Sequence, residues 1–133
     1  RLPQLPNLTA AQREIMEIVW CRSEVSASKV REILSEKRKL ARNTVRTLLE
    51  RMEQKGWLKH REEGRTYLYS PTHSRPAIIG QEVVQVIDDV CGGSPETLLT
   101  ALLNYRGLTP GELERIQALL ENARAKHPRK KGD

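Results

Sequence analysis

The sequence of 133 residues predicts a mainly α-helical fold with one small β-hairpin. Three amphipathic helical patterns come first, and two short strand patterns joined by a glycine-containing turn follow them. Three helices followed by a hairpin is the order of a winged helix-turn-helix domain. Three further helical patterns make up the second half, which we interpret as a C-terminal helical dimerisation arm.

The first helix is predicted from its cap and its apolar side. Thr9 and Gln12 have the spacing of a capping box, in which Thr9 is the N-cap. Such a cap matters because the first backbone N–H groups of a helix have no partner inside it. The helix should continue to about Arg22. Its buried side is expected to consist of Leu8, Ile15, Met16, Ile18, Val19 and Trp20.

The second helix follows another cap. Ser26 is a good N-cap residue, and Val25 before it can pack against Val30 as a hydrophobic staple. We expect this helix to run to about Lys37. Its buried residues should be Val30, Ile33 and Leu34. The basic linker 38–40 then leads to the third helix, and this connection fits a helix-turn-helix.

The third helix should begin near Arg42 and end at Gly56, a natural stop. Ala41 cannot cap it with a side chain, so Asn43 is an alternative N-cap that would start the helix later. One face is apolar, because Val45, Leu48, Leu49 and Met52 fall at i, i+3, i+4 and i+7. The exposed face and its flanks carry Arg42, Asn43, Thr44, Arg46, Thr47, Glu50 and Arg51. Side chains of these types hydrogen-bond base edges and phosphates, so this is a candidate recognition helix.

The hairpin is predicted from two alternating strand patterns at 57–61 and 66–70. Residues 62–65 form a four-residue turn, with Gly64 available where a positive φ is needed. Pro71 ends the second strand, because proline cannot donate to a strand ladder. A hairpin directly after the recognition helix is the wing of a winged helix.

The second half predicts three helices. The first covers about 75–90 and is broken by Gly92 and Gly93. Ser94 caps the next, which stops before Gly107, and a second capping box starting at Thr109 opens the last, which ends before 128. These short helices cannot form a private core, so their apolar stripes predict a homodimer. The predicted dimer interface is Leu98, Leu99, Leu102, Leu103, Leu113, Ile116, Leu119 and Leu120.

These patterns predict a domain organisation. Residues 1–72 form the DNA-binding domain, 73–128 the helical dimerisation region, and 129–133 a disordered basic tail. Basic residues are concentrated in the first part: residues 1–70 hold 15 Lys and Arg against 9 Asp and Glu, whereas residues 71–128 hold 5 against 7. This asymmetry favours a polyanionic partner such as double-stranded DNA over a membrane surface.

Composition excludes several other classes. No apolar run approaches the roughly 20 residues that span a bilayer, and no signal peptide is visible, so we expect a cytoplasmic protein without membrane contact. Cys21 and Cys91 are too few for a disulfide scaffold, and we expect reduced, partly buried thiols. The three histidines, His60, His73 and His127, form no nucleophile or metal pattern. An enzyme, a bound metal and a cofactor are therefore not expected.

Four segments, LTAAQREIMEIVW, VSASKVREIL, NTVRTLLERMEQKGWLKH and REEGRTYLYSP, together resemble the BlaI/MecI family of bacterial transcriptional repressors. The resemblance runs from about Leu8 to Lys126. Its most specific parts are Thr44–Leu48, Tyr67–Tyr69 and the position of the Gly92–Gly93 break. It implies a homodimer that binds a palindromic operator and represses β-lactamase or other stress-response genes.

The resemblance also implies roles for individual residues. The family's T-x-R motif reads bases in the major groove and corresponds to Thr44 and Arg46, and we expect Asn43 and Thr47 beside them to contact bases. The expected contacts to the DNA backbone are Arg42, Arg51, Lys59, Arg61 and Arg65. Glu62 and Glu63 would repel a phosphate, which leaves deep insertion of the wing into the minor groove open.

Family members are inactivated by cleavage between an Asn and a Phe in the dimerisation arm. The matching residues are Asn104 and Tyr105, which makes this bond a candidate site for a regulatory protease. Tyrosine keeps an aromatic side chain but leaves the protease type open. The cysteine-rich motif of a copper-responsive branch is absent, so copper sensing by that route is not expected.

Two alternatives to a repressor remain. One is a winged-helix protein-interaction module without sequence-specific DNA binding, which need not be basic. The other is an RNA-binding winged helix, which would need stacking aromatics that the recognition helix lacks.

Overall fold

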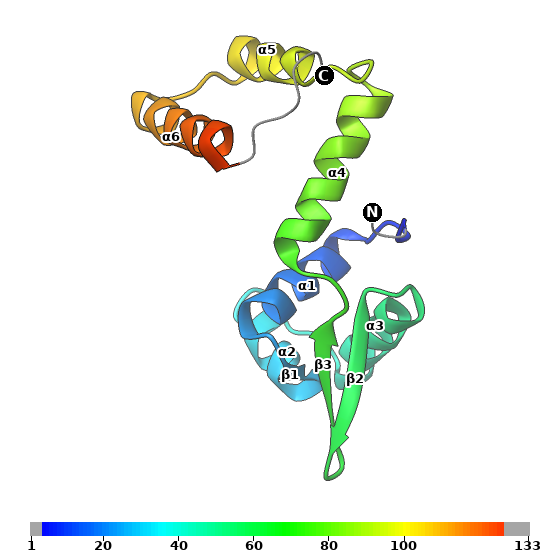
Figure 1. The fold of residues 1–133 in the computed structure, drawn as a ribbon. Helices are drawn as coiled ribbons and strands as arrows, with labels where there is room; N and C mark the ends of the chain where they lie inside the picture. Colours follow the sequence, from blue (N-terminus) through cyan, green and yellow to red (C-terminus); the bar gives the residue numbers. More distant parts are fainter. Residues whose placement is uncertain (1–3, 127–133) are drawn as a thin grey trace. The chain divides into compact units, whose positions relative to one another are not determined.

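The computed structural model describes residues 4–126, and the predicted tail 129–133 therefore lies outside the described residues. The elements, shown in Figure 1, are α1 (Ala10–Arg22), β1 (Val25–Ser26), α2 (Ala27–Leu34), α3 (Arg42–Gln54), β2 (Leu58–Glu63), β3 (Thr66–Pro71), α4 (Arg75–Asp89), α5 (Pro95–Tyr105) and α6 (Pro110–Lys126). The chain divides into two compact units between Glu82 and Val83, inside α4. The mainly helical fold with a small antiparallel sheet confirms the predicted fold class.

The predicted caps hold the first two helices. The Thr9 hydroxyl accepts from the N–H of Gln12 at 3.2 Å, and Thr9 N–H donates to the Gln12 side chain at 2.9 Å. Ser26 caps α2. The predicted end of α2 at Lys37 is wrong, because the helix stops at Leu34. The Ser35 hydroxyl donates to the Glu32 carbonyl at 2.6 Å. Residues 35–39 have no apolar side chain that could pack a further helical turn against the core.

The sheet has three strands rather than two. β1 pairs antiparallel with β3, with Val25 opposite Tyr69, and the strand order is β1-β3-β2, as Figure 1 shows. A strand of two residues is too short to show alternation, so only its pairing reveals it. The predicted four-residue turn is also wrong. The strands continue to Glu63 and Thr66, and a two-residue loop joins them, with Gly64 at φ +64°.

The core lies within the first unit, where α1, α2 and α3 pack with the sheet. Its buried side chains are Ile15, Met16, Val19, Val25, Val30, Leu34, Val45, Leu49, Met52, Trp57, Leu58, Tyr69 and Ile78. Both tryptophans satisfy their indole N–H groups: Trp57 donates to the Pro6 carbonyl and Trp20 to the His73 carbonyl. Trp20 itself remains partly exposed, whereas Trp57 is buried.

The capping box of α1 should have a measurable effect on stability. Thr9→Ala removes the side-chain acceptor of the Gln12 N–H and should lower the free energy of unfolding by about 0.5–2 kcal/mol. Urea unfolding measures this change. Thr47→Ala is the matched control, because Thr47 is exposed within α3 and makes no cap. Equal losses in both variants would contradict a stabilising role for the cap.

In the second unit, no side chain of residues 83–126 is buried. Gly92 and Gly93, both at positive φ, separate α4 from α5 as predicted, and Ser94 caps α5. Thr109 and Glu112 exchange hydrogen bonds at 3.0 and 3.1 Å as the expected capping box of α6. No residue of α5 or α6 is buried. Both cysteines are free thiols; Cys91 is partly buried, but Cys21 is exposed, contrary to expectation.

Candidate nucleic-acid interface

Helix α3 is fixed by its apolar face, which leaves the opposite face in solvent. Val45, Leu49 and Met52 are buried in the core. The helix begins at Arg42 with Ala41 as N-cap, and no side chain caps it. The alternative start at Asn43 is therefore wrong. Asn43 lies in the first turn with its side chain exposed.

The helical spacing of 3.6 residues per turn arranges the predicted contact residues of α3 in three rows. Asn43 and Thr47 lie near the centre of the exposed face, Thr44 and Arg51 along one edge, and Arg42 and Arg46 along the other.

Arg46 remains accessible on its edge of the helix. Its Nε lies 3.7 Å from Glu50, and both side chains are more than half exposed. An exposed pair at this separation contributes little, so Arg46 is available for a ligand.

A groove of about 510 Å³ lies beside the edge of α3 that carries Arg46. It is lined by Ser26, Ala27, Ser28, Arg31, Arg42, Arg46, Arg65, Thr66, Tyr67 and Tyr69. Four of these are arginines, which come from α2, α3 and the hairpin loop, and no lining residue is acidic. We call this feature the arginine groove. Its charge and its place beside the exposed face of α3 suit the phosphate backbone of a nucleic acid.

Sequence reasoning missed Arg31 and Tyr67 as members of this groove. Arg31 Nε donates to the Leu40 carbonyl at 3.0 Å, which holds its side chain toward the linker before α3. The helical pattern alone could show that Arg31 is exposed. It could not show that Arg31 faces α3, because that depends on how the two helices pack.

Aromatic contacts connect the hairpin to α3. The rings of His60 and Tyr67 stack with centroids 4.2 Å apart, and His60 Nδ1 lies 2.7 Å from Glu53 on α3. Tyr69 is buried next to them. Its pKa is raised mainly by this burial and secondly by the negative charge of Glu53. These contacts set the position of one groove wall relative to the recognition helix.

Lys59 and Arg61 lie apart from the arginine groove. Side chains alternate along a strand, and His60 between them points to α3, so Lys59 and Arg61 project from the other face of the sheet. Arg61 donates twice to Glu24 at 2.8 Å and once to Glu63 at 3.1 Å. These hydrogen bonds raise the pKa of Arg61 and lower the pKa of Glu24. Phosphate contacts by Lys59 and Arg61 stay predictions.

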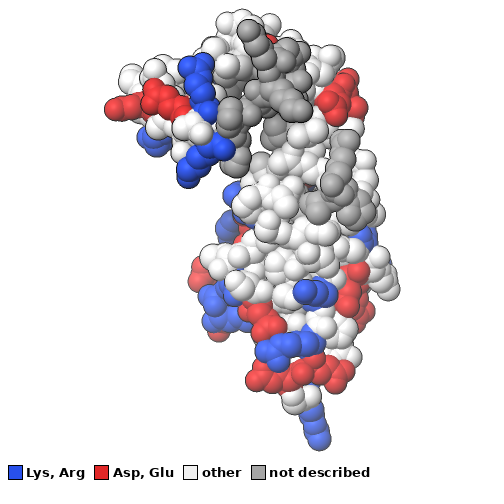
Figure 2. Space-filling view, viewed as in Figure 1, with Lys and Arg blue, Asp and Glu red and all other residues white. Residues whose placement is uncertain are grey.

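The hairpin tip carries Arg65, the second residue of the two-residue loop, and Glu62 and Glu63 precede the loop. Figure 2 shows a basic side chain projecting from the tip, with acidic and basic side chains mixed behind it. Arg65 also lines the arginine groove, together with Arg42 and Arg46 of α3. No group of three His, Cys, Asp or Glu among residues 4–126 could hold a metal ion.

The penicillinase repressor family model matches residues 8–122. The chain belongs to this family. The transcriptional regulator BlaI of Mycobacterium tuberculosis is 28% identical over 130 residues, which cover 96% of this chain and 94% of that protein. The penicillinase repressor of Bacillus licheniformis is 24% identical over 120 residues, which cover 90% of this chain and 94% of that protein.

A solved structure is similar to the winged-helix part. The solution structure of the DNA-binding domain of the repressor BlaI is 30% identical, with a TM-score of 0.50, and covers 56% of this chain and 90% of that chain. The family resemblance expected from the sequence is therefore confirmed. No helix within residues 4–126 of this family member is long and apolar enough to cross a membrane.

The arm of this penicillinase repressor family member exposes its apolar stripes. Of the eight residues predicted to form a dimer interface, Leu98, Leu102 and Ile116 are partly buried and the others are exposed. Leu119 and Leu120 are 66% and 62% exposed. Apolar side chains exposed in rows along two helices are typical of a surface that a partner covers.

The Asn104–Tyr105 bond lies in the last turn of α5, and Tyr105 is 92% exposed. Just beyond it, Arg106 Nη2 donates to Glu112 at 2.8 Å, which links the end of α5 to the first turn of α6. This hydrogen bond, with the backbone N–H of Thr109, lowers the pKa of Glu112 to about 2. The candidate bond is accessible, but a protease that binds extended chain would need the last turn of α5 to open.

Proposed function

We propose that this protein is a DNA-binding transcriptional repressor that acts as a homodimer on a palindromic operator. The observation that carries the proposal is the arginine groove beside the exposed face of α3. Membership of the penicillinase repressor family supports it, because the relatives described above are named repressor or transcriptional regulator. Residues 1–72 act as the DNA-binding domain and residues 73–128 as the dimerisation region.

In this proposal, α3 enters the major groove of the operator. Asn43 and Thr47 face the base edges, and Thr44 and Arg46 reach bases from the two sides of the helix. Arg46 suits guanine, whose O6 and N7 accept two parallel hydrogen bonds from a guanidinium, and a threonine methyl suits thymine. Arg42, Arg51 and Arg65 bind phosphates and fix the register of the helix without reading sequence. Arg31 joins them from α2.

The proposed dimer covers the apolar stripes of α5 and α6. A twofold axis would place the same stripes of two chains against each other, which removes their apolar surface from water. Two winged helices related by this axis then bind two half-sites about one helical turn, or a multiple of it, apart. A palindromic operator follows from this symmetry.

Regulation is proposed to occur by proteolysis at Asn104–Tyr105, which would release α6 with Leu113, Ile116, Leu119 and Leu120 from the rest of the interface. We infer that the repressed genes encode a β-lactamase or stress-response proteins and that the repressor works in the cytoplasm. The family supports this inference, and the exposure of Tyr105 supports the cleavage site.

Selection of genomic fragments by the purified protein, followed by a salt titration on the selected fragment, tests the function. A palindromic consensus is expected. Roughly eight arginine–phosphate contacts in a dimer, four per chain, should give a slope near −7 of log affinity against log salt concentration. Fragments without a shared sequence, or binding that survives high salt unchanged, would contradict the proposal and favour a protein-interaction module.

Substitutions of Arg65 and Lys59 compare the arginine groove with the opposite face of the hairpin. Arg65→Ala should weaken binding to all DNA sequences alike and make the salt slope of a dimer shallower by about 2, because it removes one phosphate contact per chain. Lys59→Ala removes the same charge from the other face of the sheet and should have a smaller effect. Equal effects would show that phosphates contact both faces, as the sequence predicted for Lys59.

A further inference from the structure

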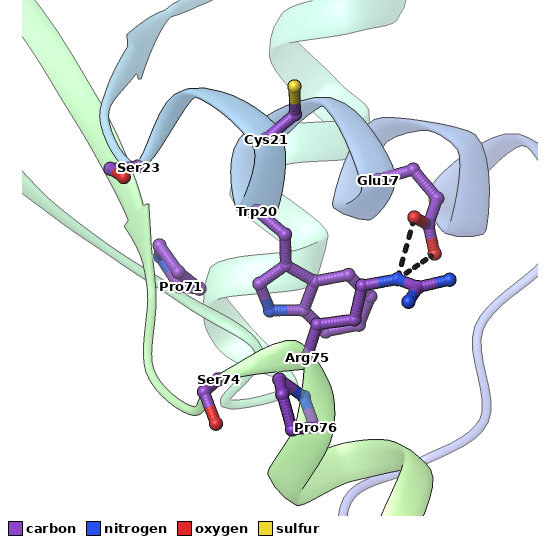
Figure 3. Close-up of a pocket in the computed structure, with 8 residues that line it drawn as sticks. All are labelled: Glu17, Trp20, Cys21, Ser23, Pro71, Ser74, Arg75 and Pro76. Carbon is purple, nitrogen blue, oxygen red and sulfur yellow. Dashed lines mark hydrogen bonds and ion pairs between the residues drawn. The ribbon is translucent and has the colours of Figure 1, made fainter. Parts of the chain in front are cut away.

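A second concave site lies in the first unit, where the C-terminal part of α1 meets the end of β3 and the start of α4. It is an open depression with a volume of about 420 Å³. The lining includes the indole of Trp20 and the rings of Pro71 and Pro76. Figure 3 shows Trp20 in the middle of the lining.

The indole N–H of Trp20 is already used in a hydrogen bond. Its Nε1–H donates to the His73 carbonyl at 2.9 Å, so the indole is held in one orientation. The indole and the two proline rings are rigid side chains that line the pocket. Surfaces of this kind favour a planar aromatic ring, which stacks on them without losing conformational freedom of its own.

The polar edge of the pocket is the ion pair between Arg75 and Glu17, in which only the Nε of Arg75 takes part. Arg75 Nε donates to the two carboxylate oxygens of Glu17 at 2.9 and 3.2 Å, and Figure 3 draws these contacts. Within residues 4–126, the two terminal nitrogens of Arg75 donate to no residue. A guanidinium can bind a second carboxylate through that free edge with two parallel hydrogen bonds.

The lining carries one charge of each sign, Arg75 and Glu17, and the start of α4 adds a positive contribution beside Arg75. Arg75 is the first residue of α4, and the positive end of the helix dipole adds to its charge at this point. The Ser74 hydroxyl accepts the Ala77 N–H at 3.2 Å at the start of α4. The only carboxylate in the lining is Glu17, which faces the Nε side of the guanidinium.

We propose that this pocket binds a small planar aromatic carboxylate, with the ring against Trp20 and the two prolines and the carboxylate on the terminal nitrogens of Arg75. The site is separate from the arginine groove and shares no residue with it. The proposal does not depend on DNA binding, and either can fail without the other.

Benzoate and benzamide are suitable probes because they differ only in the charged group. The full chain, labelled with ¹⁵N, has two indole N–H signals, one from Trp20 and one from the buried Trp57. Titration with benzoate should shift the Trp20 signal and saturate in the millimolar range, while the Trp57 signal stays in place. Benzamide should bind about tenfold or more weakly, because it lacks the charge that Arg75 recognises.

Two variants test the role of Arg75. Arg75→Gln should abolish the preference for benzoate over benzamide while leaving the weak binding of benzamide unchanged. Glu17→Gln keeps Arg75 and removes the competing carboxylate, so benzoate should bind more tightly than to the original chain. Because both side chains are about half exposed, neither change should disturb folding. A Trp20 signal that does not respond, equal binding of the two probes, or a preference that survives Arg75→Gln would overturn the proposal.

Discussion

Arg46→Ala should remove most of the ability of the protein to distinguish its operator from unrelated DNA. Losing a bidentate contact to guanine costs roughly 1–3 kcal/mol of discrimination, which corresponds to about 5–150-fold in each half-site. The side chain is 68% exposed and its contact with Glu50 is long, so folding should not change. Competition binding of the selected operator against a scrambled duplex measures the ratio of the two affinities.

Arg46→Lys is the matched control for charge. Lysine keeps the positive charge but not the planar fork, so affinity for scrambled DNA should stay close to the original while discrimination falls. If Arg46→Lys kept full discrimination, Arg46 would be a phosphate contact rather than a base reader. Thr44 or the central residues Asn43 and Thr47 would then have to supply the specificity.

A double substitution in α6, Leu119→Glu with Leu120→Glu, should convert a dimer into monomers. Two charges on each chain would be buried without partners in the proposed interface, which is strongly unfavourable. Because the two half-sites would then be bound independently, affinity for the palindrome should fall on the order of 10²–10⁴-fold. Sedimentation gives the mass of the particle, and binding to a half-site should be unaffected.

The single chain makes this experiment easy to interpret. Leu119 and Leu120 are mostly exposed in it, so glutamate at these positions should not disturb the fold of the chain itself. Ala118→Glu is the control, because Ala118 is exposed on the opposite side of α6. A chain that sediments as a monomer before any substitution, or a double variant that remains dimeric, would contradict the proposed interface.

The caps show how far sequence reasoning extends. Thr9, Ser26, Ser94 and Thr109 each make the hydrogen bonds that their patterns predict, and the helices begin next to them. These contacts join atoms three residues apart, so the local sequence contains both partners. The end of α2 was misplaced because the polar residues after Leu34 can form either a helix turn or a loop.

The functional surface was only partly predictable. The exposed face of α3 follows from helical periodicity, and the structure places Asn43, Thr44, Arg46 and Thr47 on it or at its edges. The pairing of Arg61 with Glu24 does not follow from the sequence pattern, because the two residues are 37 positions apart. Nothing in the local pattern of either residue indicates that they meet across the sheet.

The sequence by itself determined the order of helices and strands, the caps, the apolar face of α3 and the family, because each depends on residue types at short spacing. Tertiary structure decided that Val25 and Ser26 form a strand, that Arg31 joins Arg65 at the arginine groove, and that Trp20 and Arg75 line one pocket. These features depend on backbone pairing and helix packing between segments far apart in the chain. Such contacts form only when the whole first unit buries its core.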